Sequence, residues 1–316
     1  MKEFLKKIIL FLLLTPLAYL FFIACIVLFF PEAKTSMTIN YKQTTGHSHS
    51  RFQEVMHVKN IDILFIGPST TYMGFDPRIF EKAGFSVFNL GSSAQTPRQT
   101  YILLNRFLDH LNPKNIVYNP HPGTFIIDGF ESTTDLISNL SVGKDTFKLA
   151  VDSKNLQAIN TFLFKFFVDF FNTEEDYNEP KVIGIDTYID RGYVTRSGIV
   201  APKDVRESNS FKRTQEWDPL QFQLDYFEKN INMIKKRNIE LLFVIPPVNS
   251  NAYEALHFSS LKFQNYIKQF GSFIDYNKHL ALNDSLHFYD NTVHLNQAGV
   301  YTFNRVIIER GDFKFD

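Results

Sequence analysis

Residues 61–71 read IDILFIGPSTT: an apolar run ends in a glycine, and hydroxyl side chains follow almost at once. Short runs that are nearly all apolar are typical of strands buried on both faces of a parallel sheet. The chain contains five candidates for such strands, at residues 61–66, 86–90, 115–119, 240–245 and 273–276.

Longer amphipathic segments separate these candidate strands. Residues 97–111 and residues 219–236 each place apolar side chains on one side at helical spacing. Because strands alternate with helices, we expect an α/β fold with a doubly wound, mostly parallel five-stranded sheet. Ligands bind beyond the carboxyl ends of the strands in such a sheet, so the residues after each strand are the candidates for chemistry.

The N-terminus carries an uncharged apolar run at residues 8–30. As a helix it would extend about 34 Å, which is enough to cross the hydrocarbon core of a membrane. Lys2, Lys6 and Lys7 precede it, so the positive-inside bias predicts a cytoplasmic N-terminus and an extracytoplasmic remainder. A cleaved signal peptide is the alternative, but the run is longer than the apolar h-region of a usual signal peptide and no A-x-A-like site follows, which favours an uncleaved anchor.

The rest of the chain predicts one catalytic domain on a stem. Residues 31–58 are polar and lack periodicity, so we expect a solvated stem, and residues 59–316 form the domain. An insertion is expected at about residues 130–216. Within it, residues 155–171 predict a helix whose apolar stripe packs against the sheet, with a lipid-facing stripe as the alternative. The stripe comprises Leu156, Ile159, Leu163, Phe166, Phe167 and Phe170. Residues 178–216 predict a polar loop or hairpin over one end of the sheet.

Composition excludes several classes of function. Lys plus Arg and Asp plus Glu both number 33, so the net charge is zero and we expect no nucleic-acid partner. The only cysteine, Cys25, lies in the apolar run, which excludes an intramolecular disulfide and an extracytoplasmic cysteine nucleophile. His47, His49 and His57 lie in the predicted stem without the carboxylates or cysteines of a metal site, so we expect neither metal nor cofactor.

Three residues predict nucleophilic catalysis. Ser69 follows the first strand, where a serine can be exposed, although such a serine can also cap a helix or help a loop to cradle an anion. Asp290 and His294 lie in one loop before a final helix at residues 297–310. A serine hydroxyl needs a neutral imidazole to accept its proton and a carboxylate to orient the imidazole, so we predict a Ser69, His294 and Asp290 triad.

Three blocks of the chain resemble the SGNH or GDSL-like hydrolases, especially membrane-anchored bacterial members linked with acyl chemistry of the cell envelope. Residues 66–71, IGPSTT, resemble the block that holds the nucleophile, and residues 88–93, FNLGSS, resemble the second block. Residues 289–299 resemble the last block, usually D-x-x-H. The blocks bracket residues 61–310, and the resemblance implies a flavodoxin-like sheet and an acyl-serine mechanism.

The resemblance also implies an oxyanion hole made by the N–H groups of Ser69 and Gly91, with a side-chain amide from a third block. That block departs from the family pattern G-x-N-D, because residues 117–121 read VYNPH. Asn119 is the expected donor. Asp290 is one residue farther from His294 than in the family pattern.

The predicted function is that of an extracytoplasmic serine esterase or O-acyltransferase. Its expected substrate is an acyl ester or an acylated glycan of the envelope or a secreted glycan, with acetyl as the expected acyl group. Whether water or a sugar hydroxyl resolves the acyl-enzyme stays open. The alternatives are an SGNH-fold module that binds envelope polysaccharide without chemistry, and a phosphate-binding flavodoxin-like protein. The latter would leave the pair of Asp290 and His294 unexplained.

Overall fold

The computed structural model describes residues 1–30, 35–36, 38–42, 46–173, 177–196, 198, 216–289 and 293–313. The chain divides into two compact units. The first comprises Met1–Thr44 with Thr133–Asn178, and the second comprises Thr45–Ser132 with Glu179–Asp316. We call them the N-terminal unit and the sheet unit, and each is described by itself.

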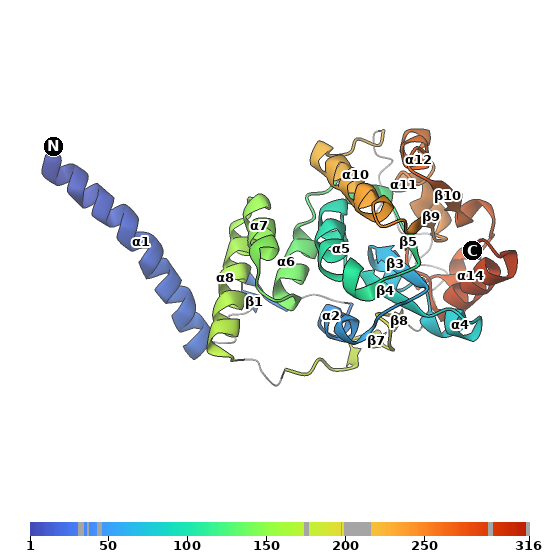
Figure 1. Cartoon of the computed structure of the whole chain (residues 1–316), viewed down its shortest axis with the longest axis horizontal. Helices are drawn as coiled ribbons and strands as arrows, with labels where there is room; N and C mark the ends of the chain where they lie inside the picture. The colour runs from blue at the N-terminus through green and yellow to red at the C-terminus, as the bar shows by residue number, and fades with distance from the viewer. Residues whose placement is uncertain are drawn as a thin grey trace. The chain divides into compact units, whose positions relative to one another are not determined.

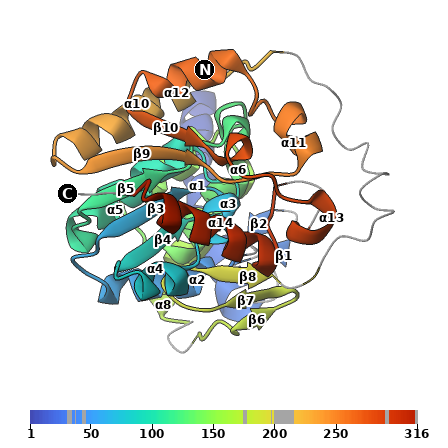
Figure 2. The same ribbon diagram turned by 90° about the vertical axis from the view of Figure 1, so that its right-hand side faces the viewer.

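A parallel sheet forms the centre of the sheet unit (Figure 2). Its strands, from one edge to the other, are β10 (Ser272–Asp275), β9 (Glu240–Ile245), β5 (Asn115–Tyr118), β3 (Ile63–Gly67) and β4 (Val87–Gly91). All four pairings are parallel. The predicted fold class is confirmed, and every predicted strand is present within two residues of its expected bounds. The strand order reverses between β3 and β5, and ligands bind at such a switch point.

Helices cover both faces of this sheet, with α4 and α14 on one face and α5 and α10 on the other (Figures 1 and 2). The helices of the sheet unit are α2 (Ser48–Glu54), η2 (Val55–His57), α3 (Ser69–Tyr72), α4 (Pro77–Lys82), α5 (Pro97–Leu111), η3 (Pro122–Phe125), α10 (Gln221–Lys235), α11 (Ser250–Ala255), α12 (Leu261–Lys268), η4 (Tyr276–Lys278), α13 (Asp284–His287) and α14 (Gln297–Arg310). Helix α5 has its predicted bounds because Thr96 and Gln99 form a capping box and Asn112 ends the helix in the left-handed conformation.

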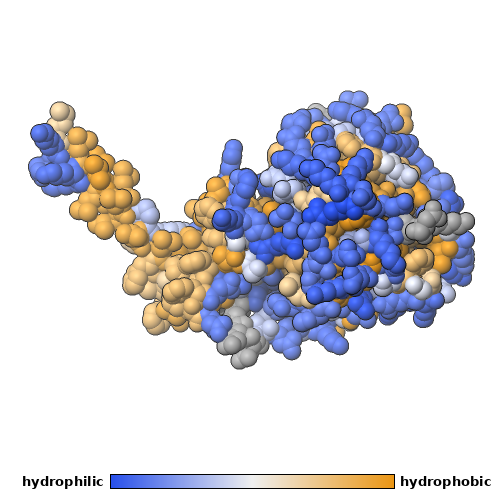
Figure 3. Space-filling view, viewed as in Figure 1, coloured by the Kyte–Doolittle hydropathy of each residue, from blue (hydrophilic) through white to orange (hydrophobic). Residues whose placement is uncertain are grey.

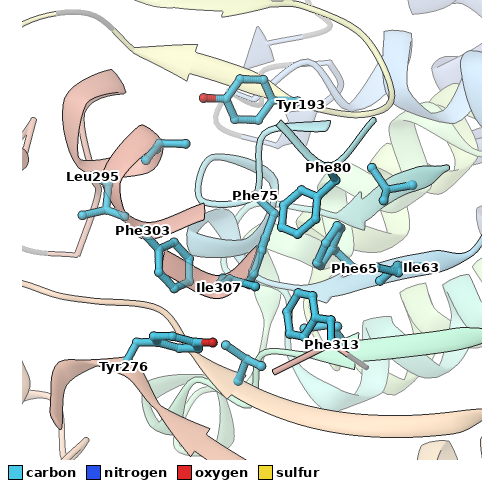
Figure 4. Close-up of a cluster of buried hydrophobic side chains, with 14 of the residues drawn as sticks. Ile63, Phe65, Phe75, Phe80, Tyr193, Tyr276, Leu295, Phe303, Ile307 and Phe313 are labelled. Carbon is cyan, nitrogen blue, oxygen red and sulfur yellow. The ribbon is translucent and has the colours of Figure 1, made fainter. Parts of the chain in front are cut away.

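Aromatic side chains fill the core between the sheet and the helices α4 and α14 (Figure 4). The rings of Phe65 on β3 and Phe75 stack at 4.3 Å, and the Phe75 ring lies 5.4 Å from that of Phe303 on α14. Burying each of these side chains stabilises the fold by about 1.5–3 kcal/mol. Leu295, next to His294 in the chain, belongs to the same cluster, so this core also fixes part of the candidate site.

The sheet unit also contains a small antiparallel sheet of three strands, β6 (Val182–Ile183), β7 (Asp186–Tyr188) and β8 (Val194–Arg196). The hairpin predicted within residues 178–216 is therefore present, although residues 199–215 lie outside the described part of the chain. Tyr193, just before β8, is fully buried in the aromatic core. The hairpin is thus built into the sheet unit.

The prediction of a solvated stem is wrong for residues 46–58. This segment forms α2 and η2, and His47, Arg51 and Phe52 are buried. The guanidinium of Arg51 donates to the carbonyl oxygens of Gly46, Gly91 and Gly192, at 2.8, 3.0 and 3.0 Å. A polar sequence is buried here because backbone carbonyls satisfy its charged donors.

The N-terminal unit is helical, with two short paired strands. Its elements are α1 (Lys2–Phe29), β1 (Thr35–Ser36), β2 (Ile39–Asn40), α7 (Lys144–Asp152), α8 (Leu156–Phe171) and most of α6 (Phe130–Asn139). Helix α1 is long and apolar enough to be a membrane span, a property that signal sequences share.

The apolar stripe of α8 does not pack as predicted. Phe164 and Val168 form a small core with Val27 of α1, Ile39 of β2 and Tyr41. The prediction that this stripe packs against the parallel sheet is therefore wrong. The predicted stripe also differs from the buried face, because Leu156, Phe166 and Phe170 of the stripe are exposed. Helical spacing identifies an apolar face, but it does not show what that face contacts.

Candidate active site

Strand β3 ends at Gly67, two residues before Ser69, and no other residue can easily replace this glycine. Gly67 has a φ of 145°, in a region that side chains rarely allow. A Cβ there would lie 2.5 Å from the hydroxyl oxygen of Thr71 and 2.8 Å from the carbonyl oxygen of Asn119. The chain therefore leaves the sheet in close contact with the end of β5, and Ser69 begins the short helix α3.

The structure brings Ser69 and His294 together although they are 225 residues apart in sequence. The Oγ of Ser69 lies 2.9 Å from the Nε2 of His294. In the neutral imidazole with the proton on Nδ1, Nε2 accepts the hydroxyl proton. Both side chains are partly exposed, so a substrate can reach the pair. This is the contact expected between a nucleophile and its general base.

Backbone hydrogen bonds hold the loop of His294. Phe288 and Leu295 form an antiparallel bridge, and the N–H of Tyr289 donates to the carbonyl oxygen of His294 at 2.9 Å. The N–H of Asn296 donates to the carbonyl oxygen of His287 at 3.0 Å. The backbone of His294 is thus held on both sides. Asp290 lies outside the described residues, and its role as the orienting carboxylate stays a prediction.

Helix α14 is also bound directly to the segment that follows the nucleophile. The buried amide of Asn304 donates to the carbonyl oxygen of Gly74 at 2.7 Å and accepts from the N–H of Asp76 at 2.7 Å. The amide of Gln297 donates to the carboxylate of Asp76 at 3.2 Å. These contacts link the helix after His294 to the chain after Ser69, and so hold the two halves of the site next to each other.

The predicted oxyanion donors lie at the same edge of the sheet. Gly91 ends β4 opposite Gly67, and a Cβ on it would lie 2.7 Å from the carbonyl oxygen of Gly67. The N–H of Asn119 donates to the carbonyl oxygen of Ile66 at 2.9 Å. Its side-chain amide donates to the hydroxyl oxygens of Thr70 and Thr71, at 2.7 and 3.2 Å. Asn119 therefore supports the nucleophile helix, and its role as an oxyanion donor stays a prediction.

His121 is a site neighbour that the sequence analysis did not include. Its Nδ1 accepts from the N–H of Gly123 at 3.0 Å, and its ring packs edge-on against Phe258 at 4.7 Å. Burial lowers the pKa of His121 to about 4, and the nearby His294 adds to the shift. His121 is therefore neutral at pH 7, with its proton on Nε2. The available signal was its position just after a strand at the ligand-binding edge.

The lowered pKa of His121 predicts a loss of stability in acid. Its folded-state pKa lies below the ordinary value of 6.5, so the unfolded chain binds the proton first as the pH falls. We expect the free energy of unfolding to decrease from pH 7 toward pH 4, and to decrease less in His121→Gln. Urea unfolding at pH 7 and pH 5, followed by the fluorescence of the single tryptophan, Trp217, measures this. An identical pH dependence in both proteins would contradict the assignment.

Three solved structures are similar to this chain. One is a GDSL-like lipase from Bacteroides thetaiotaomicron VPI-5482, with 11% identity and a TM-score of 0.38 over 80% of this chain and 88% of that one. The second is provisionally assigned as an acylhydrolase from Bacteroides fragilis NCTC 9343, with 10% identity and a TM-score of 0.39 over 82% and 92%. The third is provisionally assigned as a platelet activating factor from Streptococcus pneumonia, with 12% identity and a TM-score of 0.40 over 85% and 92%. No family model and no curated protein matches the sequence.

Proposed function

We propose that this protein is a serine esterase or O-acyltransferase with Ser69 as nucleophile and His294 as general base. The observation that carries the proposal is the 2.9 Å contact between Ser69 Oγ and His294 Nε2 at the switch point of the sheet. The sequence blocks that resemble the SGNH or GDSL-like hydrolases support the same chemistry.

The first half of the reaction forms an acyl-enzyme. His294 Nε2 accepts the proton of Ser69 as Oγ attacks the carbonyl carbon of the ester. The N–H groups of Ser69 and Gly91 stabilise the oxyanion, with Asn119 as the third predicted donor. The N–H of Ser69 is suited to this because the first residue of a helix has no intrahelical acceptor. The tetrahedral intermediate collapses, and His294 donates the proton to the departing alkoxide.

The second half regenerates the enzyme. His294 accepts a proton from the incoming hydroxyl, whose oxygen attacks the acyl-serine carbonyl, and the proton returns to Ser69 as its oxygen departs. Water gives a free carboxylic acid, as in an esterase, whereas a sugar hydroxyl gives a new ester, as in a transferase.

We further propose that the site acts outside the cytoplasm on an O-acetylated envelope or secreted glycan. Helix α1 supports this location, because three lysines precede its apolar run and the positive-inside bias then directs the chain after it outward. An enzyme held at the membrane acts on polymers that lie close to it. Release of acetate from an acetylated polysaccharide would identify an esterase, and transfer of acetyl to an added oligosaccharide would identify a transferase.

Covalent labelling tests the nucleophile. A fluorophosphonate probe reacts when a serine oxygen displaces fluoride from phosphorus while the base accepts the serine proton. We expect the wild-type protein to carry the label on the peptide that contains Ser69, as read by mass spectrometry. Ser69→Ala should take no label, and His294→Ala should take it much more slowly. Equal labelling of wild type and Ser69→Ala would refute the proposal.

A further inference from the structure

Helix α8 lies alongside the outer half of α1. The hydroxyl of Tyr19 on α1 donates to the side-chain oxygen of Asn160 at 2.6 Å, and Val27 packs with Phe164 and Val168. Tyr19 is 11 residues before Phe30, or about 16 Å along the helix axis. If α1 crosses a bilayer whose hydrocarbon core is about 30 Å thick, α8 lies at the depth of the outer leaflet.

The outward face of α8 is apolar. Phe166 and Phe170 stack at 6.2 Å on this face and are 41% and 70% exposed. The other phenylalanine pair, Phe167 and Phe171, packs toward the core shared with α1. Helix α8 thus has phenylalanine on a buried face and on an exposed one. A helix that packs on its partner in water normally has a polar outer face.

The apolar surface continues onto neighbouring segments. On α7, Phe147 and Val151 are 55% and 46% exposed, and the Phe147 ring lies 5.5 Å from Phe162 of α8. Figure 3 shows the hydrophobic colour continuing from α1 onto the end of α8 that lies against it. We call the exposed side chains of Phe147, Val151, Phe166 and Phe170 the phenylalanine face. A large continuous apolar surface on a soluble protein marks an interaction site.

Each of these two helices contains an ion pair between its own residues. Lys165 and Asp169 on α8 form an ion pair one turn apart, as do Lys148 and Asp152 on α7. Pairing reduces the cost of placing these groups near a region of low polarity. The hydrogen bond between Tyr19 and Asn160 likewise satisfies a polar pair between two apolar helices.

We propose that the phenylalanine face inserts into the outer leaflet of the same bilayer that α1 crosses. The occupant is lipid because the face is continuous with α1, which is itself surrounded by lipid. The proposal rests on the membrane anchoring proposed above but not on the chemistry of Ser69. The N-terminal unit then contacts the membrane at two places and is fixed in orientation to it.

Site-directed spin labelling of the full chain in phosphatidylethanolamine and phosphatidylglycerol vesicles tests this insertion. Cys25→Ser removes the only cysteine, and Phe166→Cys and Phe170→Cys supply the labelled sites one at a time. Leu13→Cys on α1 is the lipid control, and Leu261→Cys on α12 is the water control, at 62% and 72% exposed. Collisions with oxygen report lipid, and collisions with a water-soluble nickel complex report water.

We expect both phenylalanine sites to collide with oxygen as Leu13 does, and to collide with nickel several-fold less than Leu261. Nickel collisions equal to those at Leu261 would overturn the proposal. Shielding from both reagents would indicate a protein contact and would also overturn it. A label at Leu13 that collides with nickel would overturn the anchoring premise and the proposal with it. Ester hydrolysis, measured in the same samples, tests the proposed chemistry separately.

Discussion

Ser69→Ala is expected to lower kcat/KM for p-nitrophenyl acetate by about 10⁴-fold or more. The alanine removes the atom that forms the acyl-enzyme, and the oxyanion donors alone retain only a small part of the rate enhancement. His294→Ala should cause a loss of similar size, because the hydroxyl then has no base at 2.9 Å. The full chain in detergent, assayed above the spontaneous rate, gives these values.

The double variant tests whether Ser69 and His294 act as one catalytic unit or contribute independently to the rate. Residues that act as one unit are not additive, so Ser69→Ala combined with His294→Ala should be no slower than either single variant. Ser86→Ala is a matched control, because Ser86 is exposed next to the opposite end of β4. Undiminished hydrolysis by Ser69→Ala would rule out Ser69 as the nucleophile, whereas hydrolysis at the spontaneous rate in every protein, wild type included, would be expected of a binding module.

Arg51→Ala is expected to lower the free energy of unfolding of the sheet unit by about 3–5 kcal/mol. The change removes three hydrogen bonds from a charged donor to carbonyl oxygens, each contributing about 1.5–3 kcal/mol. The loss is smaller than their sum because water can bind to some of the freed carbonyl oxygens. The change also removes the contact of the guanidinium with the Tyr72 ring, 4.1 Å away. Urea unfolding followed by Trp217 fluorescence measures the change, because this buried tryptophan belongs to the sheet unit.

The control for Arg51 is Arg237→Ala. Arg237 is exposed and forms a surface ion pair with Asp109, so its loss should cost less than about 1 kcal/mol. Because Arg51 also holds the carbonyl oxygen of Gly91, Arg51→Ala should reduce ester hydrolysis even at urea concentrations where the protein stays folded. Equal stabilities of the two variants would show that burial of Arg51 contributes nothing.

The fold was predictable because the parallel sheet uses apolar runs that little else explains. Residues 240–245 become β9 with the expected bounds, and residues 297–310 become α14 because Asn296 caps that helix and Gly311 ends it. The Ser69 and His294 pair was predictable because each residue follows a sequence pattern that sets its backbone. The sequence pattern does not give the distance between the two side chains, because that distance depends on how the core around Leu295 and Phe75 packs.

Three features were not predictable because they depend on the fold around residues that are remote in sequence. Arg51 reads as a surface residue, and only the fold supplies the three carbonyl groups that bury it. Helix α8 reads as a helix buried against the sheet, whereas its buried face meets α1. The neutral imidazole of His121 is the third, because burial in the folded chain lowers its pKa and the nearby His294 adds to the shift.

The separation of the site residues along the chain has a consequence for biosynthesis. Ser69 is made early and His294 late, and the contacts of Asn304 show that α14 must dock before the two meet. A nascent or truncated chain that lacks this helix has lost the contacts that place His294 beside Ser69, so we expect it not to cleave esters. Contacts this remote in sequence also close slowly. The proposed ester hydrolysis should therefore appear only when the chain is nearly complete.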